Sequence, residues 1–103
     1  MLPQLPLNAE KALGGFFMPY HFYILFSQQR NCYYIGHTGD DLVERLRKHN
    51  SNHRGFTGTG GDWNVVYKEQ FQCKREAYIR EREVKAWKSK KRIEQLIGSG
   101  HSG

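Results

Sequence analysis

The chain has 103 residues, of which 38% are hydrophobic, and it carries a formal net charge of +6 at pH 7. A chain of this length forms one domain around one modest core. The sequence contains no apolar run long enough to cross a bilayer and no visible secretory signal, so it argues against a membrane protein and predicts a cytoplasmic one. The only cysteines, Cys32 and Cys73, lack metal-ligand spacing and are expected to be reduced.

The first half of the chain predicts a β-hairpin followed by a helix. Residues 1–19 show no hydrophobic periodicity and are expected to form a disordered or loosely packed extension. Two stretches, His21 to Phe26 and Cys32 to His37, are rich in strand-forming residues, and the polar turn between them predicts an antiparallel pair. Asp40 is a candidate N-cap for a helix from Asp41 to His49.

The second half predicts one strand and two helices. A glycine-containing loop spans Asn50 to Asp62, and Trp63 to Phe71 follows as a third strand. Helices are expected from Lys74 to Lys88 and from Lys90 to Ile97, and residues 98–103 read as a flexible Gly/Ser tail.

The element order is therefore β-β-α-β-α-α. This order favours an α+β fold, in which a three-stranded, mostly antiparallel sheet is flanked by helices. The chain then divides into the extension at residues 1–19, one domain at residues 20–97 and the tail at residues 98–103.

Positive charge is concentrated near the end of the chain. Between Lys74 and Ile97 there are nine Lys or Arg and four Glu, a local net charge of +5. A basic surface of this kind predicts a polyanionic partner, nucleic acid first, although a solvated helix laced with ion pairs is the alternative. The side chains expected to contact nucleic acid are Arg47, Lys48, Lys85, Lys88, Lys90 and Lys91.

Two polar residues border the apolar face of the first helix. At about 100° per residue, Arg45 and His49 lie within roughly 60° of Leu42, which with Leu46 forms the expected buried stripe. A guanidinium and an imidazole are poor core groups because desolvating a charge is costly. Either they form a site, or Arg45 extends to solvent and His49 stabilises the helix C-terminus.

The second helix shows the same anomaly. Glu81 lies within about 40° of the stripe formed by Ala77 and Val84. A carboxylate at a core margin is either paired or holds a cation, and Lys85 at i+4 is the obvious partner for a simple ion pair.

Four short motifs, which follow one another along the chain, together indicate a family resemblance. They are Tyr23 on the first strand, Tyr34-Ile35-Gly36 on the second, Arg45 with His49 on the helix, and Ala77-Tyr78-Ile79-Arg80-Glu81 followed by Lys85 and Trp87. Over about residues 20–97 the chain resembles the GIY-YIG endonuclease superfamily, most of all its small stand-alone bacterial members. One departure is His21, which stands where the family's first motif has glycine.

The resemblance implies a phosphodiester hydrolase with five catalytic residues. Glu81 would carry one Mg²⁺ or Mn²⁺ ion, which polarises the scissile phosphate. Tyr23 would act as general base towards water, and Arg45 would stabilise charge on the phosphoryl oxygens. Tyr34 and His49 would hold water or phosphate in place.

Three other features receive weaker interpretations. His37, directly after the second motif, is a further candidate that could equally be a surface group. A zinc site built from His37, His49 and His53 lacks supporting spacing and is disfavoured. The loop Gly55 to Gly61 lacks the Lys-Ser/Thr ending of a nucleotide P-loop and reads as a flap near substrate.

The sequence thus favours a metal-dependent endonuclease that cleaves nucleic acid, with DNA the expected substrate and repair among the family's pathways. A non-catalytic nucleic-acid-binding module on the same fold is the main alternative, and a protein-interaction domain with basic helices is a third. No second DNA-reading domain is predicted, so specificity is expected to be weak or to come from a recruiting protein partner. Oligomeric state is left open.

Overall fold

The structure is a computed structural model that describes residues 19–51 and 61–99. The expectations for the extension, the glycine loop with His53, and the end of the tail lie outside these described residues. The elements are β1 (Tyr20–Ser27), β2 (Cys32–Thr38), α2 (Leu42–Asn50), β3 (Trp63–Phe71), α3 (Lys74–Trp87) and α4 (Lys90–Ser99). The predicted order and the α+β class are confirmed.

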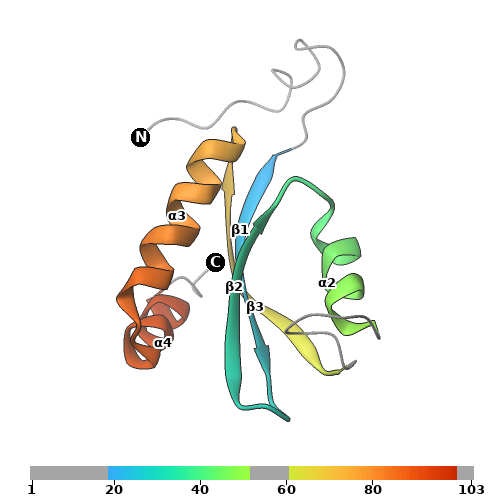
Figure 1. Cartoon of the computed structure of the whole chain (residues 1–103), viewed down its shortest axis with the longest axis vertical. Helices are drawn as coiled ribbons and strands as arrows, with labels where there is room; N and C mark the ends of the chain where they lie inside the picture. Colours follow the sequence, from blue (N-terminus) through green and yellow to red (C-terminus); the bar gives the residue numbers. More distant parts are fainter. Residues whose placement is uncertain (1–18, 52–60, 100–103) are drawn as a thin grey trace.

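The three strands form one antiparallel sheet in the order β2-β1-β3, so β2 and β3 are its edges. Helices cover both faces: α3 and α4 lie on one side, and α2 lies on the other (Figure 1). The molecule is therefore a three-layer arrangement with a thin central sheet, and the edge strand β2 borders both helical layers.

The central strand β1 is buried on both faces, which explains its continuous hydrophobic sequence. Phe22 and Ile24 pack towards α3 and α4, in a cluster with Val84. Tyr23 and Leu25 point to the opposite face and form a second cluster with partly buried side chains of α2. Burying these side chains stabilises the fold by about 25 cal/mol for each Å² of apolar surface removed from water. The alternation also places Tyr23 on the α2 side.

The bounds of α2 differ from those predicted by one residue at each end. Asp41, not Asp40, occupies the N-cap position and makes no side-chain cap bond; its carbonyl accepts the first helical bond from Arg45 at 2.9 Å. The Thr38 hydroxyl accepts the Asp40 N–H at 3.0 Å, which lengthens the preceding turn. Asn50 is the last helical residue, and its side-chain amide makes two hydrogen bonds to the backbone of Trp63.

The helices α3 and α4 meet at a sharp corner. Lys88 ends α3 with φ 49°, in the left-handed region. The Ser89 hydroxyl then accepts the N–H of Arg92 at 3.1 Å and satisfies an otherwise free donor at the start of α4. The tail was expected to begin at residue 98, but Gly98 and Ser99 continue α4, and the Ser99 hydroxyl donates to a carbonyl one turn earlier.

The free cysteines occupy different environments. Cys32 packs beside the second core cluster, as a small hydrophobic residue should. Cys73, in contrast, is exposed. It is the N-cap residue of α3, so it precedes the helical turns whose side chains pack on the sheet.

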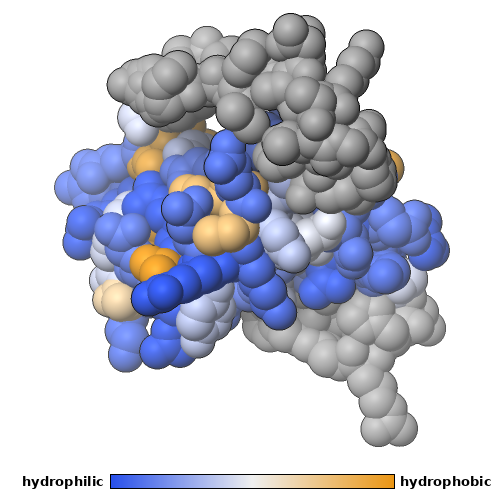
Figure 2. All heavy atoms as spheres, turned by 90° about the horizontal axis from the view of Figure 1, so that it is seen from above, coloured by the Kyte–Doolittle hydropathy of each residue, from blue (hydrophilic) through white to orange (hydrophobic). Residues whose placement is uncertain are grey.

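The face of the molecule seen from above is mostly hydrophilic. Seen from above, blue side chains dominate the described part of the molecule and hydrophobic patches are small and separate (Figure 2). The exposed large hydrophobic residues are Val43, Val66, Tyr78 and Ile79. Within the described ranges, every helix is too short or too polar to cross a membrane.

Candidate active site at the β2 edge

The second motif places its residues alternately on the two faces of the sheet. Tyr34 lies on the α2 side and packs with the cluster of Tyr23, whereas Ile35 packs with the α3 cluster. Gly36 and His37 repeat this alternation. Because β2 is an edge strand, groups on its two faces approach one another around a single strand. One short motif therefore contributes to both halves of a site.

The first half is centred on the hydroxyl of Tyr23. This oxygen lies 3.0 Å from Nε2 of His49 and is also hydrogen-bonded to the guanidinium of Arg45. Burial raises the pKa of Tyr23 above its ordinary value of 10.0, with further contributions from Tyr34 and Glu81, while Arg45 opposes the increase. The phenol is therefore neutral at physiological pH and has a hydrogen-bond partner on each side.

Aromatic packing completes this half. The rings of Tyr34 and His49 have centroids 4.7 Å apart, and Tyr23 meets His49 edge-on at 5.9 Å. Trp63 approaches Tyr34 from β3 at 6.3 Å. The imidazole is thus held by rings as well as by the hydroxyl of Tyr23, which limits its rotation.

The sequence left open that Arg45 extends to solvent and that His49 stabilises the C-terminus of the helix. The structure places both side chains differently. His49 is the only buried residue of α2, with 7% exposure, so it serves the tyrosine cluster and not the helix terminus. Arg45 is half-buried, and its Nε atom is buried without a hydrogen-bond partner among the described residues. A buried donor left unpaired at a cluster of polar groups is suited to an incoming anion.

The second half of the site is the Glu81 carboxylate on α3. One oxygen lies 2.5 Å from Nδ1 of His37, and the other lies 2.6 Å from Nζ of Lys85. Burial would raise the pKa of Glu81, but the hydrogen bonds from His37 and Lys85 outweigh it and leave the pKa lowered. Glu81 is therefore ionised, and an ionised carboxylate accepts hydrogen bonds, so Nδ1 of His37 carries the proton.

Arg80 fixes the orientation of α3 beside this carboxylate. Its guanidinium donates to Glu69 of β3 at 3.0 Å and to Glu83 at 2.9 Å, and it also lies over the ring of Phe22. The helix is thereby tied to the sheet one residue before Glu81. Burial would lower the pKa of Arg80, but its hydrogen bonds to Glu69 and Glu83 outweigh this effect and leave the pKa raised, so the tie persists at every physiological pH.

The structure brings four of the predicted catalytic residues, Tyr23, Tyr34, Arg45 and His49, into one connected cluster. Glu81 lies across the β2 edge from them and contacts His37 and Lys85. The two halves are electrostatically linked because the negative charge of Glu81 contributes to the raised pKa of Tyr23. Lys85 is the partner that the simple ion-pair alternative required, so that alternative also finds support.

His37 emerges as a stronger part of this site than its sequence position indicated. Nδ1 of His37 lies 2.5 Å from Oε1 of Glu81. The only sequence signal for this contact was the position of His37 directly after the second motif. Its ring also meets Tyr78 edge-on at 5.6 Å. The departure at His21 does not disturb the strand at that position, since His21 pairs with Thr38 on one side and Gln70 on the other. The one shift in the β1–β3 register falls between Ile24 and Leu25.

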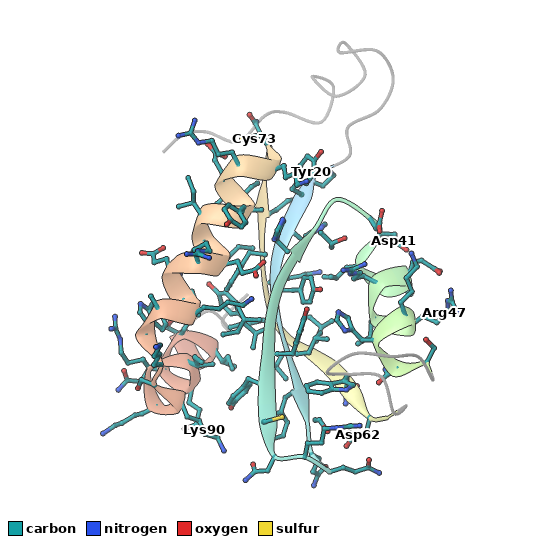
Figure 3. The ribbon with its side chains drawn as sticks, viewed as in Figure 1. Tyr20, Asp41, Arg47, Asp62, Cys73 and Lys90 are labelled. Carbon is teal, nitrogen blue, oxygen red and sulfur yellow. The ribbon has the colours of Figure 1, made fainter. Side chains whose placement is uncertain are left out.

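The basic residues expected at a nucleic-acid surface fall into two groups. Arg47 and Lys48 lie on the exposed side of α2, where Arg47 points away from the sheet and bonds to Glu44 (Figure 3). The others lie at or near the corner between α3 and α4, namely Lys85, Lys88, Lys90 and Lys91, all exposed. Both groups are accessible to a polyanion.

The donor chemistry at Glu81 fits a hard divalent ion. Mg²⁺ keeps several of its waters and is often held by one or two carboxylates, so a single ionised carboxylate is a sufficient anchor. No group of three or more His, Cys, Asp or Glu suited to a metal occurs in the described part of the chain, so a fully protein-ligated ion has no site there. An ion at Glu81 would share this carboxylate with His37 and Lys85, each of which contacts one of its oxygens.

Comparisons with known proteins identify the family of the chain. No curated protein sequence matches the chain. Among solved structures, it is similar to the solution NMR structure of the UPF0213 protein BH0048 from Bacillus halodurans, with 31% sequence identity, a TM-score of 0.49, and coverage of 79% of this chain and 84% of that one. The family described as the GIY-YIG catalytic domain matches residues 19–94, a span that contains every motif of the site. The chain therefore belongs to the GIY-YIG family.

Proposed function

We propose that this protein is a metal-dependent endonuclease that hydrolyses phosphodiester bonds in DNA. The observation that carries the proposal is the buried Tyr23–His49–Arg45 cluster, placed across one strand from the ionised carboxylate of Glu81. Membership of a nuclease-type family supports the reaction class. The free thiols of Cys32 and Cys73 support a reducing compartment such as the cytoplasm.

Glu81 is the residue that would hold Mg²⁺ or Mn²⁺, with waters as the remaining ligands. When bound, such an ion polarises the scissile phosphate and neutralises charge on the leaving oxygen. The contribution of the protein is to keep Glu81 ionised before binding. The hydrogen bonds from His37 and Lys85 do this, because they lower the pKa of the carboxyl against the effect of burial.

Tyr23 acts as a proton relay and not as a standing phenolate. Its raised pKa keeps the hydroxyl protonated, so it accepts a proton only while passing its own to Nε2 of His49, 3.0 Å away. As the water oxygen forms its bond to phosphorus, its proton moves to Tyr23 and the proton of Tyr23 moves to His49. The bond to the leaving oxygen breaks, and that oxygen takes a proton from solvent.

Arg45 stabilises the phosphoryl oxygens during this step. The hydrogen bond from its guanidinium to Tyr23 fixes its position, and its buried Nε donor is unpaired among the described residues. An anion that accepts this donor gains a charge-assisted bond in a site shielded from water. Tyr34, whose ring packs on His49, keeps the imidazole in the orientation that the relay needs.

One observation favours the non-catalytic alternative. Both oxygens of Glu81 are in contact with cationic or N–H groups, as in an ordinary structural ion-pair network. In that case the basic surface binds nucleic acid and Glu81 serves only to orient α3. The unpaired Arg45 donor suits a phosphate in either case, but the buried Tyr23–His49 pair has no role in such a module, which is why we place catalysis first.

The test is cleavage of labelled duplex, single-stranded, flapped and branched DNA, with and without Mn²⁺. Wild type is expected to cut at least one substrate only with the ion, and Glu81→Gln is expected to abolish cutting while DNA affinity is kept. Glu83→Gln is the matched control, since Glu83 is 56% exposed and pairs with Arg80, three residues away. Cutting by Glu81→Gln at the wild-type rate contradicts the proposal, as does metal-independent cutting.

A further inference from the structure

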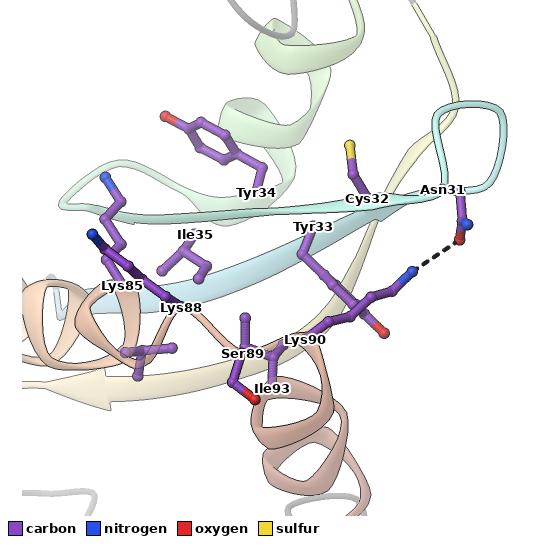
Figure 4. Close-up of a pocket in the computed structure, with 11 residues that line it drawn as sticks. Asn31, Cys32, Tyr33, Tyr34, Ile35, Lys85, Lys88, Ser89, Lys90 and Ile93 are labelled. Carbon is purple, nitrogen blue, oxygen red and sulfur yellow. Dashed lines mark hydrogen bonds between the residues drawn. The ribbon is translucent and has the colours of Figure 1, made fainter.

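A cavity of about 550 Å³ lies beside the edge strand β2, facing the corner between α3 and α4 (Figure 4). Its floor is apolar and is built by Tyr33 and Ile35 from the strand and by Val84 and Ile93 from the helices. These floor residues belong to the core cluster on the α3 side or pack against it. The cavity is within the roughly 300–1,000 Å³ range of pockets that hold small molecules.

The rim of this cavity is cationic. Lys85, Lys88 and Lys90 all line it, and in the close-up their side chains extend around its margin. The left-handed backbone of Lys88, with φ 49°, turns the chain so that residues from both helices face the same hollow. Lys90 donates to Asn31 in the β1–β2 turn at 3.3 Å, which closes the far end. An occupant must therefore combine a flat apolar part with negative charge.

The cavity adjoins the Glu81 half of the candidate active site. Lys85 lines it and also contacts Glu81 at 2.6 Å. Tyr34 contributes to its wall, while the ring of Tyr34 lies on the α2 side of the strand against His49 (Figure 4). A strand bound at Glu81 would therefore have the cavity beside it, on the α3 side of β2.

We infer that the cavity receives one unpaired nucleotide of the strand being cut, with its base on the apolar floor and its phosphates on the lysine rim. A paired base in duplex DNA has its faces stacked and its edge hydrogen-bonded, so a duplex offers this floor only phosphates. An unpaired base has a free π-face, and aromatic side chains bind it with little regard to sequence. This inference rests on the proposed function for the class of ligand, and it predicts that single-stranded segments next to the cut are preferred.

Binding without metal separates this inference from the catalytic proposal. Fluorescence anisotropy in EDTA measures the affinity of the full chain for a labelled ten-nucleotide single strand and for the matching ten-base-pair duplex. Oligonucleotides in which one base at a time is replaced by an abasic analogue keep every phosphate and remove one base. We expect one position at which the loss of the base weakens single-strand binding at least about fivefold, the lower end of one stacked base.

Two substitutions test whether the cavity is where the unpaired nucleotide binds. Lys88→Gly removes one rim charge at a left-handed position that glycine adopts without strain, so the fold is kept. Lys74→Ala is the matched control, because it removes the same charge from an exposed position at the other end of α3 and does not line the cavity. Lys88→Gly is expected to weaken single-strand binding more than duplex binding, and Lys74→Ala to change both by similar small factors.

The outcomes are distinct. Equal loss of single-strand and duplex affinity in Lys88→Gly, or no sensitive abasic position, overturns the inference and leaves the lysines as contacts for duplex phosphates. A protein that binds single strands through the cavity but never cuts DNA keeps this inference and overturns the catalytic proposal. A protein that cuts duplex DNA but binds single strands no better through the cavity does the reverse.

Discussion

Tyr23 and Gly36 are direct partners across β1 and β2, and Gly36 has no room for a side chain. A Cβ atom at Gly36 would lie 2.8 Å from the hydroxyl oxygen of Tyr23 and 3.1 Å from the ring of Tyr34. Both neighbours are large aromatic residues held in a packed cluster. The glycine of the second motif is therefore required by the close approach of the two tyrosines, and not by an unusual backbone angle.

Gly36→Ala is expected to displace the hydroxyl of Tyr23 and to destabilise the fold by about 1–3 kcal/mol, the usual cost of overpacking. Cleavage should fall further than the stability loss explains, because the relay to His49 depends on a 3.0 Å contact. The measurements are thermal unfolding and single-turnover cleavage at a temperature where the variant stays folded. Gly98→Ala is the control, since nothing lies within 4 Å of that position. Equal activity in the two variants would contradict this account.

Stability at alkaline pH should depend on Tyr23. Burial raises its folded-state pKa above 10.0, so the folded protein holds this proton more tightly than the unfolded chain does. The contribution is complete below pH 10 and is lost as pH rises through the folded-state pKa. Tyr23→Phe has no such proton, so its unfolding temperature should fall less steeply between pH 9 and pH 11, a range set by the ordinary tyrosine pKa of about 10.

Thermal unfolding at several alkaline pH values measures this difference, and Tyr78→Phe serves as the control because Tyr78 is 45% exposed. If the unfolding temperature fell equally steeply with pH in wild type and Tyr23→Phe, Tyr23 would ionise as freely in the folded protein as in the unfolded chain.

Substitutions of Arg45 and Arg47 should affect different quantities, catalytic rate and DNA affinity respectively, although the two residues are only two positions apart on one helix. Arg45 contacts Tyr23 and has a buried Nε, whereas Arg47 has 65% of its side chain exposed and pairs with Glu44. Loss of one charge-stabilising donor in a catalytic site typically costs about 10²–10³ in rate. Arg45→Ala should therefore lower the single-turnover rate by that factor with little change in DNA affinity.

Arg47→Ala is the counterpart in this experiment, and its expected effect is a modest loss of affinity at an unchanged single-turnover rate. If Arg45→Ala instead lowered affinity and rate by the same factor, Arg45 would be a phosphate contact in the ground state only.

Lys85 should control how much metal the protein needs. Its ammonium lies 2.6 Å from an oxygen of Glu81 and competes with any ion for that carboxylate. Lys85→Met keeps the aliphatic stem and removes the charge, so the Mn²⁺ concentration for half-maximal cleavage should fall. Substrate must be saturating, because Lys85 also lines the proposed nucleotide cavity.

Lys88→Met is the control for Lys85→Met, because it removes a charge from the same cavity rim without a contact to Glu81. A metal requirement that rises in Lys85→Met would mean that the lysine assists the ion, for example by holding Glu81 in place.

Local pattern in the sequence determined the elements and the composition of the site. The run from His21 to Phe26 and the motif around Tyr34 predicted the hairpin, and helical spacing placed Arg45 beside His49 and Glu81 beside Ala77. These features follow from side-chain periodicity, which is a property of neighbouring residues. The α+β class and the family followed from the order of those elements and motifs.

Tertiary packing alone decided the distances and the burial. The contact of His37 with Glu81 joins residues 44 positions apart, and the bond of Asn50 to Trp63 extends α2 past its predicted end. Tyr23 has a raised pKa because it is buried, and it is buried because helices cover both faces of β1. The helix on its own side, α2, comes after β1 in the sequence. The cavity exists because Lys88 turns the chain between α3 and α4. Spacing along one element cannot specify contacts between elements, since those depend on how the sheet and both helical layers pack together.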